Sequence, residues 1–195
     1  MKKALLHVDI QNDFCPGGSL AVIEGDMVVQ PANELTRRFE SMGLPVFFTR
    51  DWHPVNHSSF KDNGGDWPPH CVADTQGAAF HTDLYRPDSA VIISKATEAG
   101  SDAYSGFEGT DLADRLKALG VTGIVITGLA TDYCVKNTVL DGLKHGFSVE
   151  VVREAIRAVN VNPGDGEKDR GDETCRGPVC LCVRGPGVTV CRYRP

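Results

Sequence analysis

Short runs of apolar residues recur along the chain, separated by polar or glycine-containing segments. The runs are rich in Val, Ile and Phe, and their length is typical of buried strands. We predict five strands, at Ala4 to Ile10, Pro45 to Thr49, Ala90 to Ser94, Ile124 to Ile126 and Phe147 to Val152.

Between these runs, apolar residues repeat at helical spacing, and each repeat ends at a glycine. This pattern predicts helices from about Met27 to Met42, from Asp111 to Leu119, and from the turn at Thr131 to Gly146. Strands that alternate with helices indicate an α/β fold. We therefore expect a three-layer α/β/α, Rossmann-like domain with a mainly parallel sheet and helices on both of its faces.

Composition narrows the function classes. The chain has 195 residues, 41% of them hydrophobic, and a formal net charge of -6. This charge disfavours nucleic acid and anionic membranes as partners. No apolar run approaches the roughly 20 residues that span a bilayer, and no signal peptide is evident, so we expect a cytoplasmic protein. The oligomeric state stays open, a homo-oligomer included.

A polar residue stands at the end of each of the first four predicted strands. Asp9 ends the first, while Asp51, Lys95 and Cys134 follow the second, third and fourth. Any one of them has an ordinary interpretation as a turn or strand-end residue. Ligands of parallel sheets bind at the carboxyl ends of the strands, so we expect all four to meet in one crevice.

Three of these residues form a plausible nucleophilic set. Cys134 falls in the first turn of a predicted helix, where the helix dipole favours a thiolate, so we expect a lowered pKa. The alternative is a small buried cysteine that only packs the turn. Asp9 can take and return a proton, and Lys95 can stabilise the negative charges. Backbone N–H groups of Ala130 and Cys134 could bind an oxyanion. The set suits acyl transfer from an amide through a thioester.

Asp51, His53 and His70 form a second candidate set. In extended backbone, Asp51 and His53 point the same way, and His70 would complete three ligands for Zn²⁺, Fe²⁺ or Mn²⁺. His57 is either a fourth ligand or a residue that orients the others. The alternative is that these histidines are surface polar groups.

Several motifs together resemble the nicotinamidase/pyrazinamidase family of isochorismatase-like cysteine hydrolases, up to about Asp165. They are Asp9-Ile10-Gln11-Asn12-Asp13-Phe14, Asp51-Trp52-His53-Pro54, Trp67-Pro68-Pro69-His70-Cys71-Val72, Lys95, Ser105-Gly106-Phe107 and Gly128-Leu129-Ala130-Thr131-Asp132-Tyr133-Cys134-Val135. The two histidine motifs are the more specific ones, because the metal site marks the nicotinamidase branch.

The resemblance implies an activity, a cofactor and a pocket. It implies that Cys134 attacks the carboxamide of nicotinamide, or of pyrazinamide, and that a metal, Zn²⁺ first among the candidates, holds the ring nitrogen. Nicotinic acid and ammonia would be released, as in NAD salvage. It also implies a cis peptide between Leu129 and Ala130, and a substrate pocket formed by Phe14, Trp67, Tyr104 and Ala130. Core packing is the alternative role for the three aromatic residues.

Two rival functions stay open. One is hydrolysis of another amide or carbamoyl compound by the same superfamily, whose other members generally lack the metal set. The other is a folded but inactive binding homologue, although binding alone does not need a base beside a thiol.

The last part of the chain departs from the family pattern. We assign residues 1–166 to the hydrolase domain and 167–195 to an atypical tail rich in Cys, Arg, Gly and Pro, in which Gly187 to Tyr193 could add a strand. The tail is a genuine extension, a structural metal site, or the product of a reading frame shifted near Lys168. The candidate ligands of that metal are Cys175, Cys180, Cys182 and Cys191.

Overall fold

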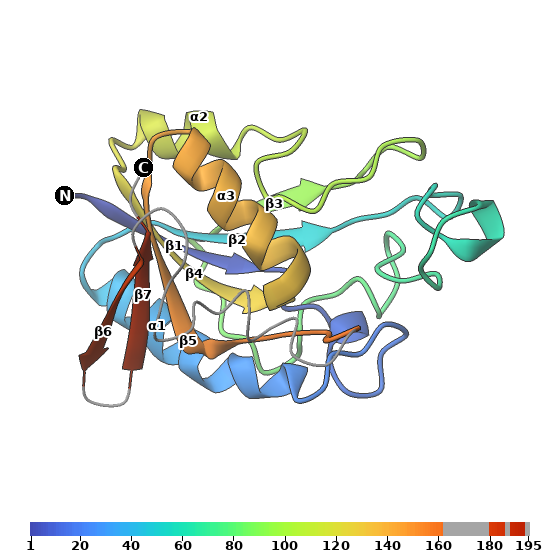
Figure 1. The fold of residues 1–195 in the computed structure, drawn as a ribbon, viewed down its shortest axis with the longest axis horizontal. Coiled ribbons are helices and arrows are strands. Elements are labelled where there is room, and N and C mark those ends of the chain that lie inside the picture. Colours follow the sequence, from blue (N-terminus) through green and yellow to red (C-terminus); the bar gives the residue numbers. More distant parts are fainter. Residues whose placement is uncertain (162–179, 186–187, 194–195) are drawn as a thin grey trace.

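A single seven-stranded sheet organises the computed structural model, which describes residues 1–161, 180–185 and 188–193. The strand order is β3-β2-β1-β4-β5-β7-β6 (Figure 1). The first five strands run parallel, β7 pairs antiparallel with β5, and β6 pairs antiparallel with β7. The strands are β1 Lys3–Val8, β2 Val46–Asp51, β3 Val91–Lys95, β4 Gly123–Leu129, β5 Ser148–Arg157, β6 Cys180–Gly185 and β7 Val188–Tyr193.

Helices cover both faces of the sheet, which confirms the three-layer prediction. Helix α1 lies on one face, and α2 and α3 lie on the other (Figure 1). The side chains of β1 alternate accordingly: Leu5 belongs to the core under α1, whereas Ala4 and Leu6 belong to the core under α2 and α3. The helices are α1 Val29–Ser41, α2 Leu112–Ala118 and α3 Lys136–Lys144, with 3-10 turns η1 Asn12–Phe14, η2 Gly25–Val28 and η3 Lys61–Asn63 and a π-helix η4 Thr131–Val135.

Every residue of the central strand β4 is buried, as expected for a parallel strand covered on both faces. Near its end the strand passes very close to β1. Gly128 has a φ of +113°, and a Cβ placed on it would lie 2.0 Å from the carbonyl oxygen of Val8. Only glycine fits this position, which brings β4 to its turn directly beside the end of β1.

The predicted positions of most helices and strands are correct, but the prediction missed three features of these elements. Strand β5 continues to Arg157 instead of ending at Val152. The turn that leads into α3 is a π-helix, whereas we predicted an ordinary first turn. Strand β6 was not predicted, because its residues gain their extended form by pairing with β7.

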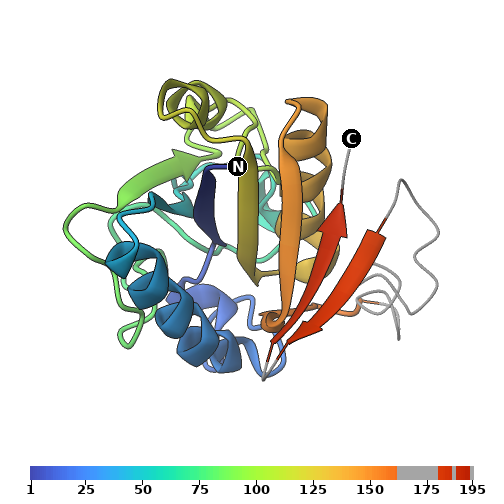
Figure 2. The same cartoon turned by 90° about the vertical axis from the view of Figure 1, so that its left-hand side faces the viewer.

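The tail contributes two strands to the sheet. The predicted strand at the end of the chain is present as β7, which pairs with β5, and β6 completes the hairpin at the sheet edge (Figure 2). The boundary at residue 166 lies outside the described residues, as do Cys175 and the side chains of Cys180, Cys182 and Cys191. The metal and reading-frame hypotheses for the tail therefore stay untested.

None of the helices in the described ranges is long and apolar enough to cross a membrane.

Candidate active site

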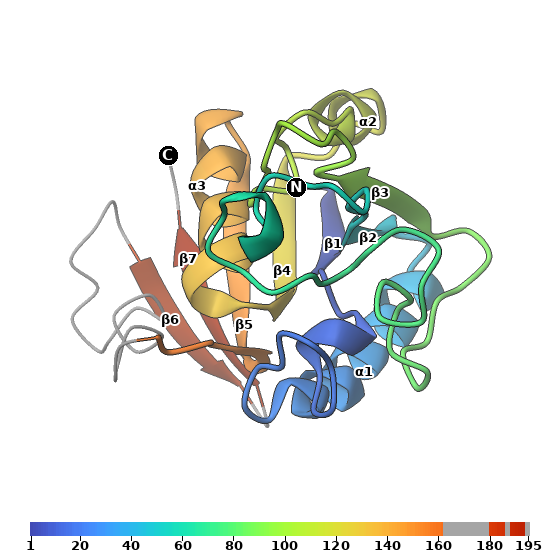
Figure 3. The same ribbon diagram turned by 90° about the vertical axis from the view of Figure 1, so that its right-hand side faces the viewer.

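The carboxyl ends of the parallel strands bring four polar residues together. Asp9 follows β1, Asp51 and Lys95 end β2 and β3 and are paired in register, and Cys134 lies in η4 after β4. Figure 3 looks at this end of the sheet, where the segment between β2 and β3 crosses in front of the strands. The predicted convergence of the four strand ends is thus present.

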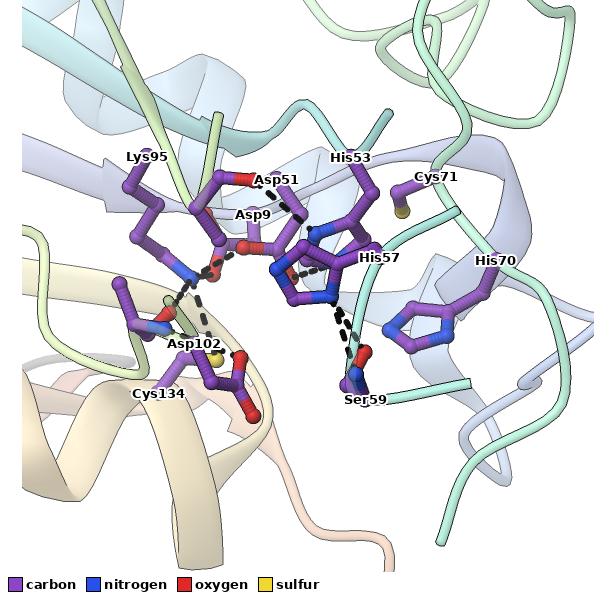
Figure 4. Close-up of polar contacts among 12 residues, drawn as sticks. Asp9, Asp51, His53, His57, Ser59, His70, Cys71, Lys95, Asp102 and Cys134 are labelled. Atoms are coloured by element: carbon purple, nitrogen blue, oxygen red, sulfur yellow. Dashed lines mark hydrogen bonds and ion pairs between the residues drawn. The ribbon is translucent and has the colours of Figure 1, made fainter. Parts of the chain in front are cut away.

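The Lys95 ammonium is the centre of this cluster (Figure 4). Its Nζ lies 3.1 Å from Asp9 Oδ2 and 3.6 Å from Cys134 Sγ. It also donates hydrogen bonds to Asp51 Oδ1 and, at 2.9 Å, to the carbonyl oxygen of Ala103. Burial disfavours the ammonium, but the carboxylates of Asp51 and Asp9 outweigh this cost and raise the pKa of Lys95 well above its ordinary value. Lys95 is therefore a fixed positive charge beside the thiol.

Asp9 is placed to exchange a proton with Cys134. A carboxylate oxygen of Asp9 and the sulfur of Cys134 lie within 4.8 Å of each other. Oδ1 of Asp9 accepts a hydrogen bond of 2.6 Å from the hydroxyl of Thr49. Complete burial raises the pKa of Asp9, although Lys95 favours its carboxylate form. A carboxyl group with a raised pKa is a better proton acceptor and donor near neutral pH.

The expected pKa of Cys134 was wrong. Burial raises the pKa of this thiol well above its ordinary value, and the lowering by Lys95 does not compensate. The sequence argument considered only the position at the start of a helix. In the fold, the thiol is 7% exposed and faces two carboxylates, so the resting state is the neutral thiol. Attack on a substrate therefore needs a base, and Asp9 stands where a base is required.

Backbone strain accumulates around the site. Asp9, Cys71 and Ala96 have φ values of +48°, +47° and +50°, in the left-handed region that side chains with a Cβ rarely adopt. Each such residue costs on the order of 1–3 kcal/mol and persists only where its surroundings enforce it. Asp9 is the proposed base, and the other two follow His70 and Lys95 directly. The peptide bond between Leu129 and Ala130 is cis, as the resemblance implied.

Asp51, His53 and His70 form a compact donor set beside the lysine cluster. One potential ligand atom from each lies within 4.8 Å of the others. His53 Nδ1 faces the carbonyl oxygen of Ala96 at 3.3 Å, and His70 Nδ1 faces that of Pro68 at 2.8 Å, so each ring presents Nε2 to the centre. Burial and the neighbouring His70 lower the pKa of His53 to about 3, which keeps its ring neutral. Two imidazoles and a carboxylate fit Zn²⁺ and similar divalent ions.

His57 lies outside that donor set. Its Nδ1 is 2.7 Å from Ser59 Oγ, and its Nε2 is 3.2 Å from the carbonyl oxygen of Ser101. The ring lies against His53, with 4.2 Å between the ring centroids. Of the two roles considered for His57, this arrangement favours orientation of His53 over ligation.

A second group of possible ligands does not suit a metal. Asp9, Asp51 and Cys134 also offer atoms within 4.8 Å of one another. The Lys95 ammonium contacts all three, so a cation already sits among these groups. A metal ion there would be repelled by the lysine.

Sequence reasoning missed the role of Gln11. Its side-chain amide donates to the carbonyl oxygens of Asp51, at 2.8 Å, and Ala78, at 2.9 Å, and it accepts a hydrogen bond of 2.8 Å from the N–H of Asp51. Gln11 thereby holds the backbone N–H and C=O of Asp51, a member of the donor set. The signals in the sequence were its position after the first strand and its place in the motif from Asp9 to Phe14, neither of which indicated this role.

A cavity of about 490 Å³ joins the two residue sets, and it is partly open to solvent. Cys134, Asp51, His53 and His70 line it, together with all four predicted substrate-binding residues, Phe14, Trp67, Tyr104 and Ala130. The indole N–H of Trp67 donates to the hydroxyl of Tyr104 at 3.1 Å. Residues that we did not predict also line the cavity, namely Leu20, Ser59, Asp102, Ala103, Tyr133 and Val159.

Comparisons with known proteins agree with this geometry. Residues 3–170 match the family model of the isochorismatase domain. The chain is 41% identical to a nicotinamidase of Escherichia coli, over 84% of this chain and 86% of the relative. It is 36% identical to a nicotinamidase/pyrazinamidase of Mycobacterium tuberculosis, over 82% and 89% of the two chains.

A solved structure is similar over nearly the same region. The pyrazinamidase of Pyrococcus horikoshii in complex with zinc matches with a TM-score of 0.82 and 52% sequence identity, covering 87% of this chain and 92% of that one. With an isochorismatase domain, a cysteine in the turn after strand β4 and relatives of this similarity, the chain belongs to the nicotinamidase/pyrazinamidase family of isochorismatase-like hydrolases.

Proposed function

We propose that this protein hydrolyses nicotinamide to nicotinate and ammonia, and acts on pyrazinamide in the same way. The observation that carries the proposal is the single cavity in which Cys134, next to Asp9 and Lys95, lies beside the donor set of Asp51, His53 and His70. An amidase for another linear amide would need the thiol and the base, but not this donor set. The activity would serve NAD salvage.

Asp9 drives the first half of the reaction. Its carboxylate takes the proton of the Cys134 thiol, and the sulfur attacks the carbonyl carbon of the substrate. The backbone N–H groups of Ala130 and Cys134 stabilise the negative charge that develops on the carbonyl oxygen. Asp9 then returns the proton to the amine, the C–N bond breaks, and ammonia leaves a thioester on Cys134.

Asp9 also serves the second half. A water molecule gives a proton to the Asp9 carboxylate and attacks the thioester, and the C–S bond breaks to release the acid. Asp9 gives that proton to the departing sulfur, which restores both the thiol and the carboxylate. Lys95 stays protonated throughout, because the carboxylates of Asp51 and Asp9 hold its pKa well above the ordinary value. It offsets the negative charge of Asp9 and of the thiolate in turn.

We propose that Asp51, His53 and His70 hold one divalent ion, with Zn²⁺ the first candidate and Fe²⁺ or Mn²⁺ alternatives. The zinc-bound relative and the nitrogen-rich donor set support Zn²⁺. When bound, the ion would supply a Lewis-acidic partner for the ring nitrogen of the substrate. Phe14, Trp67 and Tyr104 would then enclose the ring and exclude water from the carboxamide.

Ammonia release from nicotinamide by the full-length protein tests the proposal. Turnover should be lost after chelation and return with Zn²⁺, Fe²⁺ or Mn²⁺. The Cys134→Ala variant should lose at least a thousandfold in kcat yet keep its metal content, because Cys134 is not a member of the donor set of Asp51, His53 and His70. Cys15→Ala is the matched control, since Cys15 is another buried thiol but lies outside the cavity. Retained turnover in the Cys134→Ala variant would remove Cys134 as the nucleophile.

A further inference from the structure

The cavity holds a carboxylate that the reaction scheme does not use. Two aspartates line the cavity, Asp51 and Asp102. Asp51 belongs to the metal donor set and forms an ion pair with Lys95. Asp102 lies on the segment between β3 and α2, is not part of that donor set, and accepts a hydrogen bond from the N–H of Ala103 instead. The side chain of Asp102 is half-buried at the wall of the cavity.

Hydrogen bonds hold Asp102 close to the nucleophile. Its Oδ1 accepts the N–H of Ala103 at 2.9 Å, and the carbonyl oxygen of Ala103 accepts a hydrogen bond from Lys95 at 2.9 Å. The same Lys95 ammonium lies 3.6 Å from the sulfur of Cys134. The segment that carries Asp102 is thus anchored to the reaction centre by the catalytic lysine, and Figure 4 shows Asp102 on the Cys134 side of the site, opposite His70.

The carboxylate of Asp102 acts electrostatically on another residue of the cavity wall, Tyr104. After burial and the contact with Trp67, Asp102 is the next influence on the pKa of Tyr104, which it raises. Lys95, the cation beside Cys134, is already paired with two carboxylates, Asp9 and Asp51. A ligand at Cys134 therefore lies in the same cavity as a negative charge that Lys95 does not balance.

Hydrolysis changes the charge of the ligand at this point. The carboxamide substrate is neutral and carries N–H donors, whereas the product is a carboxylate anion. A nearby negative charge raises the free energy of the bound product but leaves a neutral substrate almost unaffected.

We propose that Asp102 is a specificity-determining residue that favours the neutral carboxamide and repels the carboxylate product, so that the product leaves the site. This inference rests on the proposed function. It predicts that the protein discriminates between amide and acid through one side chain that takes no part in the proton transfers.

The test compares the metal-loaded wild type with the Asp102→Asn variant. Asparagine keeps an oxygen that can accept the Ala103 N–H, so the segment should stay in place. We expect the inhibition constant of nicotinate to fall roughly three- to tenfold, the size expected for a half-exposed charge near the ligand, while the KM of nicotinamide changes less than about twofold. Because salt screens the charge, the difference should shrink as ionic strength rises.

Asp114→Asn is the matched control, since it removes the same charge from an exposed position on α2 outside the cavity. Equal inhibition by nicotinate in wild type and the Asp102→Asn variant would overturn the proposal. An equal change for nicotinate and nicotinamide would also overturn it, because that result indicates a general change of the pocket.

A binding measurement separates this inference from the proposed function. Calorimetry of nicotinate and nicotinamide with Cys134→Ala protein, with and without Asp102→Asn, needs no turnover. A wild type that releases no ammonia would contradict the proposed function alone. Selective tightening of nicotinate in the calorimetry would support the role of Asp102 whatever the turnover, and its absence would refute that role.

Discussion

At the scale of single residues, the site depends on charges that compensate one another. Lys95 is completely buried but contacts Asp9, Asp51 and Cys134, so its charge is retained and the carboxylates keep a partner. Asp51 belongs to both the lysine cluster and the metal donor set. Through this one carboxylate, the proposed nucleophile would be coupled to a metal held by the donor set.

The two neighbouring histidines provide a sharp test of the metal site. His53 contributes an atom to the donor set, whereas both ring nitrogens of His57 face Ser59 and Ser101. We predict that His53→Ala loses the metal, and that His57→Ala keeps about one ion per chain with only a modestly weaker affinity, as for a ligand-orienting residue. Elemental analysis after dialysis measures both. Full occupancy in His53→Ala, or an empty site in His57→Ala, would contradict these assignments.

Identification of the candidate residues from the sequence succeeded where a residue type had to lie at a strand end. Asp9, Asp51, Lys95 and Cys134 follow four strands whose patterns are clear, and parallel strands must bring such positions together. Gln11, Asp102 and Tyr133 could not be found in this way. Their roles depend on which loops pack against one another in the fold, and the pattern of apolar residues gives no information about loop packing.

At the scale of elements, β1 is held to its neighbours by a buried polar contact as well as by apolar packing. His7 lies between α1 and β4, with its ring nitrogens next to the hydroxyls of Thr36 and Thr127. The ring also lies 4.7 Å from that of Phe48, centroid to centroid. Complete burial lowers the pKa of His7 to about 3, so the folded protein holds it neutral.

This burial predicts sensitivity to acid. The unfolded chain binds a proton to His7 below about pH 6.5, whereas the folded protein does so only near pH 3, so stability is lost as the pH falls through this window. At pH 4 the loss is on the order of 3 kcal/mol. We predict that metal-free wild type loses more unfolding free energy between pH 7 and pH 4 than metal-free His7→Gln, measured by urea unfolding. Parallel pH profiles of the two proteins would refute the assignment.

At the scale of the whole molecule, the metal should connect the segments that carry its ligands. Asp51 ends β2, His53 follows it, and His70 comes from the segment that crosses the carboxyl ends of the strands (Figure 3). An ion held by all three binds the folded chain alone and thus opposes unfolding.

We predict that metal removal lowers the melting temperature. At a free metal concentration 100 times the Kd, binding adds about 2.7 kcal/mol, which corresponds to roughly 5–10 °C for a chain of this size. Differential scanning calorimetry with and without a chelator measures the shift. His53→Ala is the control and should show no shift with added metal. A wild type with the same melting temperature in both conditions would contradict a site formed by these three ligands.

The sequence by itself determined the alternation of strands and helices, and with it the edge where the site lies. Buried parallel strands need runs of apolar residues, and the helices that cover them need an apolar residue at every third or fourth position. Both patterns are local, so they can be recognised in the sequence. These strands also determine where the strand-end residues and the histidine motifs lie.

Only the tertiary structure decided the charge states and the partners. The raised pKa of Cys134 comes from burial among strands and loops that are distant in sequence, and this burial outweighs the local helix dipole. Other features of the site likewise depend on the fold. They are the contacts of His57 with Ser59 and Ser101, the hydrogen bonds of Gln11 to Asp51, and the position of Asp102 in the cavity wall. Desolvation and contact depend on the whole fold, so no local pattern could have revealed them.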